Sequence, residues 1–422
     1  MRRPAVWLAL AAITGVAVRI ALLPTPGYAD DITQFVTWVR HIVTDGLPNA
    51  YDANLSFGPV MAFVWAAVGA LDPVFRTATD GSDLGVRLLL KLPAVLADLG
   101  LAAAVWYALR AKPTWAAAGA AAILVHPAIW FVSAWWGQYE SIFALGVLLA
   151  YLCAVHGRNG LAVVALAVAL MTKPQVAPLL VPFAAWFVAR IGWRTPRSLG
   201  RLALLAVVAG ATVVVLWLPF LAANGPSHYL ANLSEFQGQV YSVLSLNAWN
   251  LWWLVQELFA GGSLVGDAQP FIGPLTFRLV GYLVTGVLLL LVAYGVWRRP
   301  TPRTLAIGVV AAALVSFSFL TTMHERYSFV ALIFVALLIE ERWARWLALG
   351  LGIVVTANLL AAASTYLPFH LQVTGPTGIV GSIAMLGLTL GALFALLRPA
   401  ATTGAGMPPG TSAGNAGATS AA

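Results

Sequence analysis

The sequence predicts an all-α protein, a polytopic bundle of transmembrane helices without a sizeable soluble domain. Of its 422 residues, 61% are hydrophobic and only 9% are charged, whereas about a quarter of the residues in ordinary soluble domains are charged. Apolar runs of about 17 to 25 residues, the length that an α-helix needs to cross the hydrocarbon core, recur along the chain. Helices are favoured because lipid cannot satisfy a free backbone N–H or C=O.

Thirteen apolar segments are candidate spans, which predicts about 12 to 13 crossings. They are 5–23, 57–71, 86–109, 114–132, 141–155, 160–172, 175–189, 202–222, 275–297, 303–321, 327–339, 343–362 and 377–397. The segment 57–71 has a length at which re-entrant or interfacial helices are common, so whether it crosses stays open. The break around Lys173-Pro174 allows either two short spans or one long helix kinked by proline.

The spans belong to one predicted membrane domain, residues 1–400, with two long loops at 24–56 and 223–274. After it, residues 401–422 consist almost entirely of Gly, Ala, Ser, Thr and Pro. Such a composition cannot pack a core, so this tail is predicted to be disordered.

The charges orient the chain in a cell membrane. Arginines crowd the short loops at 190–201 and 298–303, which the positive-inside rule makes cytoplasmic. The two long loops carry acids instead and are therefore predicted to be extracytoplasmic. The net charge of +8 reflects this topology and the anionic lipid headgroups, and it does not indicate binding to nucleic acid.

Several classes of site are missing from the sequence. The lone Cys153 permits no intramolecular disulfide and no thiolate metal site. No Walker loop, strand-flanked G-x-G-x-x-G, H-E-x-x-H or G-x-S-x-G motif is present. An enzyme of this kind is therefore expected to take an activated substrate from the membrane.

The first long loop contains a predicted interfacial helix that begins at two adjacent acids, Asp30 and Asp31. Positions 32, 35, 36, 39 and 42 are apolar at helical spacing, and positions 31, 34, 38 and 41 form the opposite polar stripe. This pattern is typical of an amphipathic helix that lies on the membrane surface. The simplest alternative for the acids is helix capping, because Asp31 and Gln34 have the spacing of a capping box.

Other polar groups stand beside aromatic residues where apolar segments end. They are His126-Pro127, Trp135-Trp136-Gly137-Gln138-Tyr139-Glu140, Ser245-Leu246-Asn247-Ala248-Trp249-Asn250 and Met323-His324-Glu325-Arg326-Tyr327. The tryptophans among them are most simply an interfacial aromatic belt. The polar residues are candidates for a site at the outer end of the bundle.

These stretches resemble the GT-C superfamily of polytopic glycosyltransferases, most closely the bacterial proteins related to the second mannosyltransferase of GPI-anchor synthesis. The resemblance rests on the order of six short motifs: Asp31-x6-Trp38, Lys91-Leu92-Pro93-x4-Asp98, Trp136-Gly137-Gln138-Tyr139-Glu140-Ser141, Lys173-Pro174-Gln175, Asn247-x2-Asn250 and His324-Glu325-Arg326-Tyr327. It departs from the family at Phe57-Gly58-Pro59, where relatives often carry Tyr-Pro-Pro.

The resemblance implies an inverting transfer of a sugar, with mannose suggested, from a polyprenyl-phosphate-sugar donor to an acceptor hydroxyl. The acceptor class stays open among glycolipid, glycan and protein. The family's general base matches Asp31, and its neighbour Asp30 is the second catalytic candidate. Elementary chemistry agrees, because inversion needs a carboxylate at the acceptor hydroxyl and fixed positive charge at the leaving phosphate.

Three residues are candidates for binding the donor phosphate. His324 and Arg326 match a stretch that approaches the phosphate in related lipid-linked glucosyltransferases, and Lys173 is a weaker candidate. The alternatives for Arg326 are an ion pair with Glu325 or snorkelling to the membrane interface, and snorkelling is also open for Lys173.

The candidate substrate-binding residues are Gln138, Glu140, Asn247, Trp38 and Asp98. Gln138 and Glu140 could instead hold the first-loop helix in place. Asp98, an acid deep in a predicted span, has a structural ion pair with a neighbouring helix as its equal alternative.

No metal ligands and no certain cofactor are predicted, and a need for a divalent metal stays open. Many GT-C enzymes carry two separated acids in the first loop that often bridge a metal, whereas Asp30 and Asp31 are adjacent and diverge by about 100° on a helix. The competing class is a lipid or solute transporter or flippase. Such proteins usually keep ionisable residues at mid-membrane, whereas here the polar groups gather at one surface.

Overall fold

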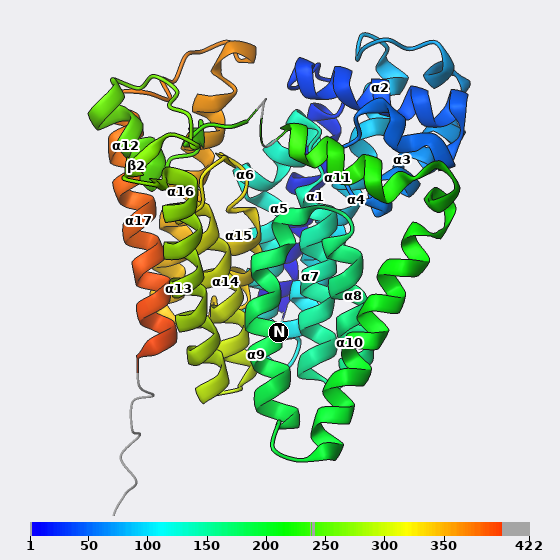
Figure 1. Ribbon diagram of the computed structural model, residues 1–422. Helices are drawn as coiled ribbons and strands as arrows, with labels where there is room; N and C mark the ends of the chain where they lie inside the picture. The colour runs from blue at the N-terminus through cyan, green and yellow to red at the C-terminus, as the bar shows by residue number, and fades with distance from the viewer. Residues whose placement is uncertain (1, 237, 239–240, 399–422) are drawn as a thin grey trace, which may run out of the picture.

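The computed structural model describes residues 2–236, 238 and 241–398, and it confirms the predicted all-α, polytopic architecture. Long helices run side by side from one end of the molecule to the other, and shorter elements gather at the upper end in Figure 1. The predicted disordered tail lies outside the described residues.

The elements divide into a bundle and an outer cap. The bundle contains α1 (Arg2–Leu22), α4 (Leu84–Leu109), α5 (Pro113–Val125), α6 (Pro127–Trp130), the π-helix η3 (Phe131–Trp136), α7 (Glu140–Val155), α8 (Asn159–Leu170), η4 (Pro174–Leu179), α9 (Leu180–Ile191), α10 (Pro196–Trp217), α13 (Phe277–Arg298), α14 (Pro302–Phe319), α15 (Phe329–Ala336), α16 (Arg342–Ala362) and α17 (Pro376–Leu397). The cap contains α2 (Ala29–Asp45), η1 (Leu47–Ala53), α3 (Pro59–Leu71), η2 (Pro73–Arg76), η5 (Leu218–Ala223), α11 (Gly225–Glu235), β1 (Ser245–Leu246), α12 (Leu251–Ala260), β2 (Pro270–Ile272), β3 (Leu275–Thr276), β4 (Met323–His324) and η7 (Ser364–Tyr366).

Twelve of the thirteen predicted segments coincide with apolar helices of the described chain. Eight helices are long and apolar enough to cross a membrane, and the bent pair 113–125 and 127–136 adds a ninth. Three shorter apolar helices, α3, α7 and α8, account for three more predicted segments. The remaining segment, 327–339, is represented by α15, which has only 8 residues.

The helix α3 does not complete a crossing. It has 13 residues, and Figure 1 draws it beside α2 in the cap and not among the long helices of the bundle. With α3 in the cap, the other twelve predicted segments belong to the bundle of the described chain. The arginine-rich loops, between α9 and α10 and between α13 and α14, lie at the lower end in Figure 1, opposite the cap.

The break at Lys173 separates α8 from η4 and α9, which run in the opposite direction, so it does not kink one long helix. The helices α7 and α8 are joined by a turn at 156–158, so the end of α8 returns to the level at which α7 begins. At that level the Lys173 Nζ lies 2.7 Å from Oε1 of Glu140, the first residue of α7. The chain then runs back through η4 and α9 to the arginine-rich end.

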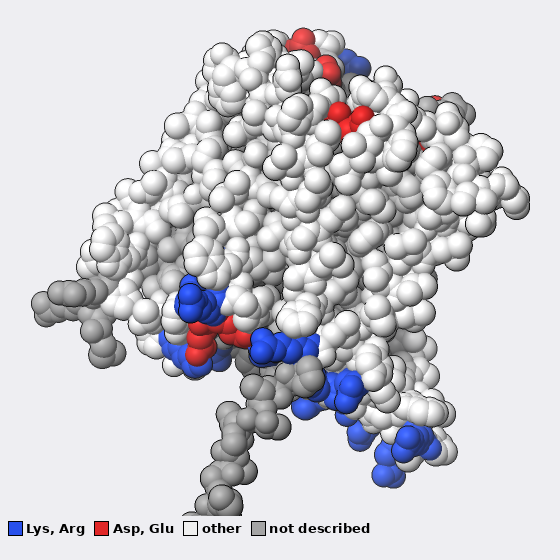
Figure 2. All heavy atoms as spheres, turned by 90° about the vertical axis from the view of Figure 1, so that its left-hand side faces the viewer, with Lys and Arg blue, Asp and Glu red and all other residues white. Residues whose placement is uncertain are grey.

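The surface of the bundle is suited to lipid. Figure 2 shows a broad belt without charged side chains on one face; most of the basic residues on this face lie below the belt, together with some acids, and further acidic residues lie above it. Large apolar side chains on α10 and α13 are exposed, including Val207 at 65% and Leu290 at 70%. Exposure of this extent in helices is expected for a protein whose belt is covered by hydrocarbon.

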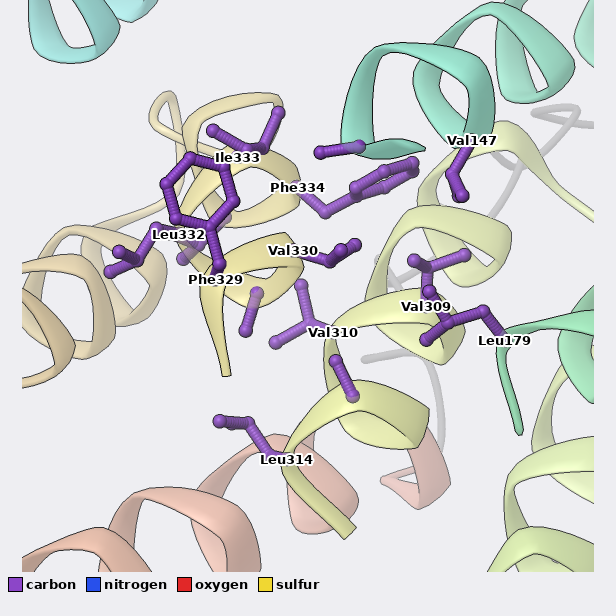
Figure 3. Close-up of a cluster of buried hydrophobic side chains, with 14 of the residues drawn as sticks. Val147, Leu179, Val309, Val310, Leu314, Phe329, Val330, Leu332, Ile333 and Phe334 are labelled. Carbon is purple, nitrogen blue, oxygen red and sulfur yellow. The ribbon is translucent and has the colours of Figure 1, made fainter. Parts of the chain in front are cut away.

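The core lies around α14. Every residue from Thr304 to Ser318 is buried, so this helix is surrounded by protein on all sides. Figure 3 shows its side chains packed against those of α15, with Val147 of α7 and Leu179 of η4 completing the cluster. Small residues such as Ala311, Ala312 and Ala313 let the neighbouring helices approach α14 closely.

Asp98 is part of a structural ion pair inside the bundle. Its Oδ2 accepts hydrogen bonds from Arg19 Nε at 2.8 Å and from Ser133 Oγ at 2.5 Å, and its Oδ1 accepts one from Ser141. Asp98 and Arg19 are 0% and 1% exposed. Both carboxylate oxygens are thus occupied by protein, which supports the ion-pair alternative over the predicted substrate contact.

Replacement of Asp98 by Ala is expected to destabilise the fold strongly. The change leaves the Arg19 charge buried without its partner, a loss of about 3 kcal/mol in the free energy of unfolding. Thermal unfolding in detergent micelles measures it. The control is Lys112→Ala, which removes an ion pair with Glu340 whose partners are 59% and 46% exposed and should cost less than about 1 kcal/mol. Normal stability of Asp98→Ala, with loss of activity alone, would instead support the substrate contact.

Candidate functional site

A cavity of about 500 Å³ opens between the cap and the bundle. Its polar lining includes Asp30, Asp31, Gln34, Gln138, Lys173, Gln175, His324 and Arg326. Its apolar lining includes Phe35, Trp38, Phe57, Phe143, Leu179, Phe236, Phe317 and Val330. Most of the predicted site residues, which are far apart in the sequence, therefore border one space of a size typical of ligand pockets.

The helix α2 carries the two acids into this cavity. The predicted apolar stripe, Ile32, Phe35, Val36, Val39 and Ile42, is buried against the rest of the cap and bundle, which confirms the amphipathic pattern. The assignment of Trp38 to the polar stripe was wrong: its indole is 3% exposed and its Nε1 donates to the Ala53 carbonyl at 3.0 Å. The indole of Trp38 points toward the core and packs against Phe57 and Trp65.

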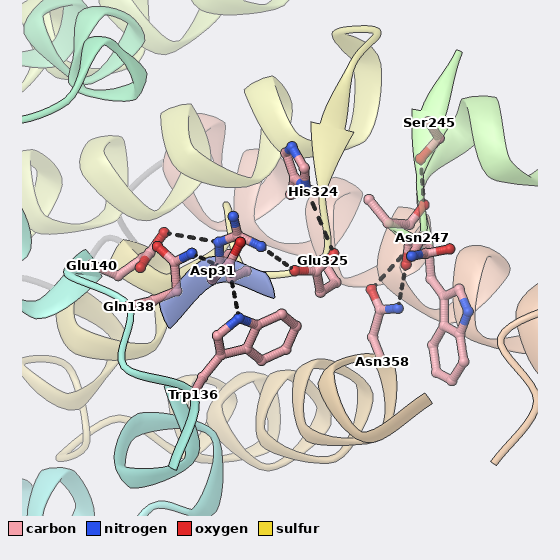
Figure 4. A network of polar contacts seen from close by, with 12 residues as sticks. Asp31, Trp136, Gln138, Glu140, Ser245, Asn247, His324, Glu325 and Asn358 are labelled. Atoms are coloured by element: carbon pink, nitrogen blue, oxygen red, sulfur yellow. Dashed lines mark hydrogen bonds and ion pairs between the residues drawn. The ribbon is translucent and has the colours of Figure 1, made fainter. Parts of the chain in front are cut away.

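Asp31 does not cap its helix. The N-cap residue is Tyr28, and no side chain makes a capping hydrogen bond there. Instead, Asp31 Oδ2 accepts hydrogen bonds from Trp136 Nε1 at 2.7 Å and from Gln138 Nε2 at 2.5 Å, as Figure 4 shows. Capping therefore does not explain Asp31, and Gln138 does contact the first-loop helix, as the sequence suggested.

The two donors converge because of the turn between them. The π-helix η3 ends at Trp136, and Gly137 follows with a φ of 91°, a left-handed conformation that favours glycine. This turn reverses the chain, and the Gln138 N–H donates to the Val132 carbonyl at 2.9 Å. Trp136 and Gln138 can thus direct their side chains at the same carboxylate oxygen.

The junction between α1 and α2 fixes where Asp31 stands. Tyr28 stacks on Trp136 with ring centroids 4.5 Å apart and planes inclined by 1°. Gly27, with a φ of 68°, lies close to the backbone of Trp135. A Cβ atom at position 27 would come within 2.2 Å of the Trp135 carbonyl oxygen. Burial and the nearby Asp31 charge raise the pKa of Tyr28 to about 12, so the phenol stays protonated.

Asp30 faces a different partner. Its Oδ2 accepts a hydrogen bond from the Tyr366 hydroxyl at 2.6 Å, and that hydrogen bond raises the pKa of Tyr366. Tyr366 also packs on Tyr28 with a centroid distance of 4.5 Å. The two adjacent acids therefore diverge as their helical spacing requires.

Two cations and two further acids form a buried cluster beside Asp31. Arg326 Nη1 donates to Glu325 Oε1 at 2.6 Å, and its Nε lies 3.4 Å from Glu140 Oε1. Lys173 Nζ lies 2.7 Å from the same Glu140 oxygen. The guanidinium is also 5.4 Å from the centre of the Trp136 ring. Burial lowers the pKa of Lys173, and the charge of Glu140 opposes that effect.

These contacts distinguish between the ion-pair and snorkelling alternatives for Arg326 and test snorkelling for Lys173. Arg326 does pair with Glu325, as one alternative held, but both residues are at most 9% exposed. Snorkelling does not account for Arg326 or Lys173, because both line the internal cavity. Glu140 contacts them rather than lining the cavity itself.

His324 is the group least suited to act as a cation here. Burial, and then the charges of Arg326 and Lys173, lower its pKa well below the ordinary value. Its ring lies between Tyr241 and Tyr327, with both centroid distances at 5.0 Å. At neutral pH the imidazole is therefore neutral and offers a hydrogen bond to the cavity instead of a charge.

Asn247 lies outside the cavity lining and organises the second long loop. Its carbonyl accepts a hydrogen bond from Asn358 Nδ2 at 2.6 Å, and Asn358 Oδ1 accepts one from the Trp249 N–H at 3.0 Å. Next to it, β1 pairs in parallel with β4, which aligns Leu246 with His324. These contacts favour a structural role for Asn247 over the predicted substrate contact (Figure 4).

The sequence did not single out four contributors to the site. Tyr241 and Gln175 line the cavity, Tyr366 binds Asp30, and Asn358 holds the second loop. Only the position of Gln175 within a quoted motif gave any signal. Among the described residues, no three His, Cys, Asp or Glu side chains are clustered so that they could hold a metal ion.

The fold is that of a polytopic helical membrane protein with a cavity between its bundle and its cap. The profile of the ALG6, ALG8 glycosyltransferase family matches residues 78–376, and the chain belongs to that family. The fold is also similar to the crystal structure of ArnT from Cupriavidus metallidurans bound to undecaprenyl phosphate, with a TM-score of 0.50 and 16% identity over 93% of this chain and 76% of that one. No curated protein matches the sequence significantly.

The Gly27 contact is open to a direct test. Gly27→Ala forces a residue with a side chain into a left-handed conformation and drives its Cβ into the Trp135 carbonyl, so we expect a loss of more than about 2 kcal/mol in stability and a fall in sugar transfer. The matched control is Gly157→Ala, since Gly157 has a φ of 75° but no atom near its Cβ position; it should cost only the backbone strain of about 1 kcal/mol. Equal melting temperatures and transfer rates for the two variants would contradict the close contact.

Proposed function

We propose that this protein transfers a sugar, with inversion, from a polyprenyl-phosphate-sugar donor to an acceptor hydroxyl at the extracytoplasmic face of the cell membrane. The observation that carries the proposal is the cavity that Asp31 shares with Arg326 and Lys173. A carboxylate and two cations at one cavity are the groups that a direct displacement at an anomeric carbon needs. Mannose is the proposed sugar on the strength of the sequence resemblance alone.

Asp31 is the proposed general base. Inversion requires a single carboxylate that accepts the proton of the attacking hydroxyl as the bond to the anomeric carbon forms. Asp31 Oδ2 is held by two neutral N–H donors, so the side chain is fixed, and no cation among the described residues forms an ion pair with it. Asp30 is the weaker candidate, because its carboxylate accepts the Tyr366 hydroxyl.

Arg326 and Lys173 are the proposed ligands of the donor phosphate. A polyprenyl phosphate leaves with a full extra negative charge, and fixed cations stabilise that charge as it develops. His324 adds a neutral hydrogen-bonding group beside them. The solved structure of ArnT with undecaprenyl phosphate supports a carrier of the same class, and the apolar lining of the cavity suits a lipid-borne substrate.

The extracytoplasmic placement is supported by the charge distribution. Residues of α2 and β4 line the cavity, α2 lies in the cap at the end of the molecule opposite to the arginine-rich loops (Figure 1), and the positive-inside rule makes those loops cytoplasmic.

The direct test is sugar transfer by the purified protein. We expect that incubation with radiolabelled polyprenyl-phosphate-mannose and a bacterial lipid extract yields a labelled product other than the donor. Replacing mannose by glucose in the donor tests the sugar assignment. Movement of the intact donor across vesicle membranes, with no product formed, would favour a transporter instead.

Asp31→Asn should abolish most of the transfer. The substitution keeps the size of the side chain and its ability to accept hydrogen bonds but removes the base, so kcat should fall about 100-fold or more. The matched control is Asp30→Asn, for which we expect a much smaller loss. A large loss in Asp30→Asn with normal transfer in Asp31→Asn would move the base by one residue.

Arg326→Ala should weaken the use of the donor. Loss of charge-assisted hydrogen bonds to the phosphate is expected to raise the donor KM about 10- to 100-fold. Arg326→Lys keeps the charge without the fork of donors and should be intermediate, while Arg110→Ala, an exposed arginine at the opposite end, serves as the control. Normal donor kinetics in Arg326→Ala would leave only its ion pair with Glu325 as an explanation.

A further inference from the structure

The amide nitrogen of the Gln138 side chain makes a hydrogen bond, whereas its amide oxygen makes none among the described residues. Its Nε2 donates to Asp31 Oδ2 at 2.5 Å, while its Oε1 is buried without a hydrogen-bond partner among the described residues. The residue as a whole is 2% exposed, and it lines the cavity. A buried carbonyl oxygen of this kind is costly unless a donor reaches it from the cavity.

The orientation of this amide follows from chemistry. A carboxylate accepts hydrogen bonds and donates none when ionised, so the atom that faces Asp31 has to be the amide nitrogen. The oxygen is then the atom left buried without a partner, on a residue that lines the cavity. A second amide oxygen, Gln175 Oε1, is also buried without a partner and belongs to a residue that lines the same cavity. Both orphaned atoms are acceptors, so the complementary ligand groups are hydroxyl or amine donors.

We propose that Gln138 is a specificity-determining residue that accepts a hydrogen bond from a second hydroxyl of the acceptor, next to the hydroxyl that Asp31 deprotonates. The proposal rests on the proposed function, in which Asp31 contacts the acceptor. The amide nitrogen and oxygen of Gln138 share one carbon, so a group that binds Oε1 lies beside the group that meets the Asp31 carboxylate. An acceptor with two neighbouring hydroxyls, as on a sugar ring, satisfies both atoms at once, whereas an isolated serine or threonine hydroxyl leaves Oε1 unpaired.

The chemistry of the step is otherwise that of the transfer. The accepting hydroxyl gives its proton to Asp31 and forms the bond to the anomeric carbon as the bond to the phosphate breaks. The neighbouring hydroxyl keeps its proton and only donates it in a hydrogen bond to Gln138. Gln138 therefore contributes to acceptor choice and not to the proton balance.

The test combines acceptor analogues with two variants. The probes are a short-chain polyprenyl-phosphate-mannose donor, octyl mannoside and octyl glucoside as acceptors, and their monodeoxy derivatives. With the unaltered protein, removal of the hydroxyl next to the accepting one should lower kcat/KM on the order of 10- to 100-fold, because Oε1 is left unpaired. A peptide with a single serine should be a poor acceptor.

The variants separate acceptor recognition from support of Asp31. Gln138→Leu removes both the contact with Asp31 and the oxygen, so the penalty for the missing neighbouring hydroxyl should vanish. Trp136→Phe removes only a hydrogen bond to the same Asp31 oxygen and keeps a ring against Tyr28, so the penalty should persist. Thermal unfolding of both variants confirms that each is folded.

Three results would overturn the proposal. One is a deoxy penalty that stays unchanged in Gln138→Leu, and another is equal transfer to the serine peptide and the glycosides. The third concerns the case in which product forms from the lipid extract but neither glycoside is used. The linkage of that product is then determined. If its acceptor has no free hydroxyl next to the accepting position, Gln138 cannot bind such a hydroxyl and the proposal is wrong. Absence of transfer in every assay, including the extract, is the separate failure of the proposed function.

Discussion

A buried cluster of opposite charges, in which Glu140 contacts both Lys173 and Arg326, is the constraint on which the site depends. Charges inside a membrane bundle are costly unless each one meets a partner. Glu140 begins α7, Lys173 precedes η4 and Arg326 lies between β4 and α15. These pairs therefore tie together three segments that the sequence separates widely, and the position of each follows from the need to satisfy the others.

The cluster also explains why several helices of the bundle are short. The helices α7, α8 and α15 have 16, 12 and 8 residues, whereas about 20 are needed to cross the hydrocarbon. Each of them stops or starts beside the cavity. Irregular backbone at this depth is tolerated where protein surrounds it or where it lines a cavity, and here local turns satisfy it, as when the Lys173 N–H donates to the Ala169 carbonyl.

The sequence predicts most of what depends on local patterns. Hydropathy identified the spans, and the apolar spacing of α2 correctly predicted the burial of Phe35 and of the isoleucines and valines of the stripe. It misplaced Trp38, because a long aromatic side chain at the edge of a stripe can turn toward the core when a pocket of other rings is available. Contacts between distant segments could not be predicted: Arg19 pairs with Asp98 across 79 positions and Tyr366 with Asp30 across 336. In both cases the residue type was visible in the sequence, but nothing in it identified the partner.

The two kinds of charged group in the site are held in different ways, and the difference suits their proposed roles. Arg326 is paired directly with a carboxylate at 2.6 Å, which fixes a cation that need not change its protonation. Asp31 is held by an indole and an amide, both neutral donors. A carboxylate locked in a direct ion pair is a weaker proton acceptor than one oriented by neutral groups, because the cation stabilises its charged form. In the proposed reaction, Glu140 and Glu325 hold Lys173 and Arg326 near Asp31, and Asp31, which is oriented by neutral donors, is left to accept the proton of a hydroxyl.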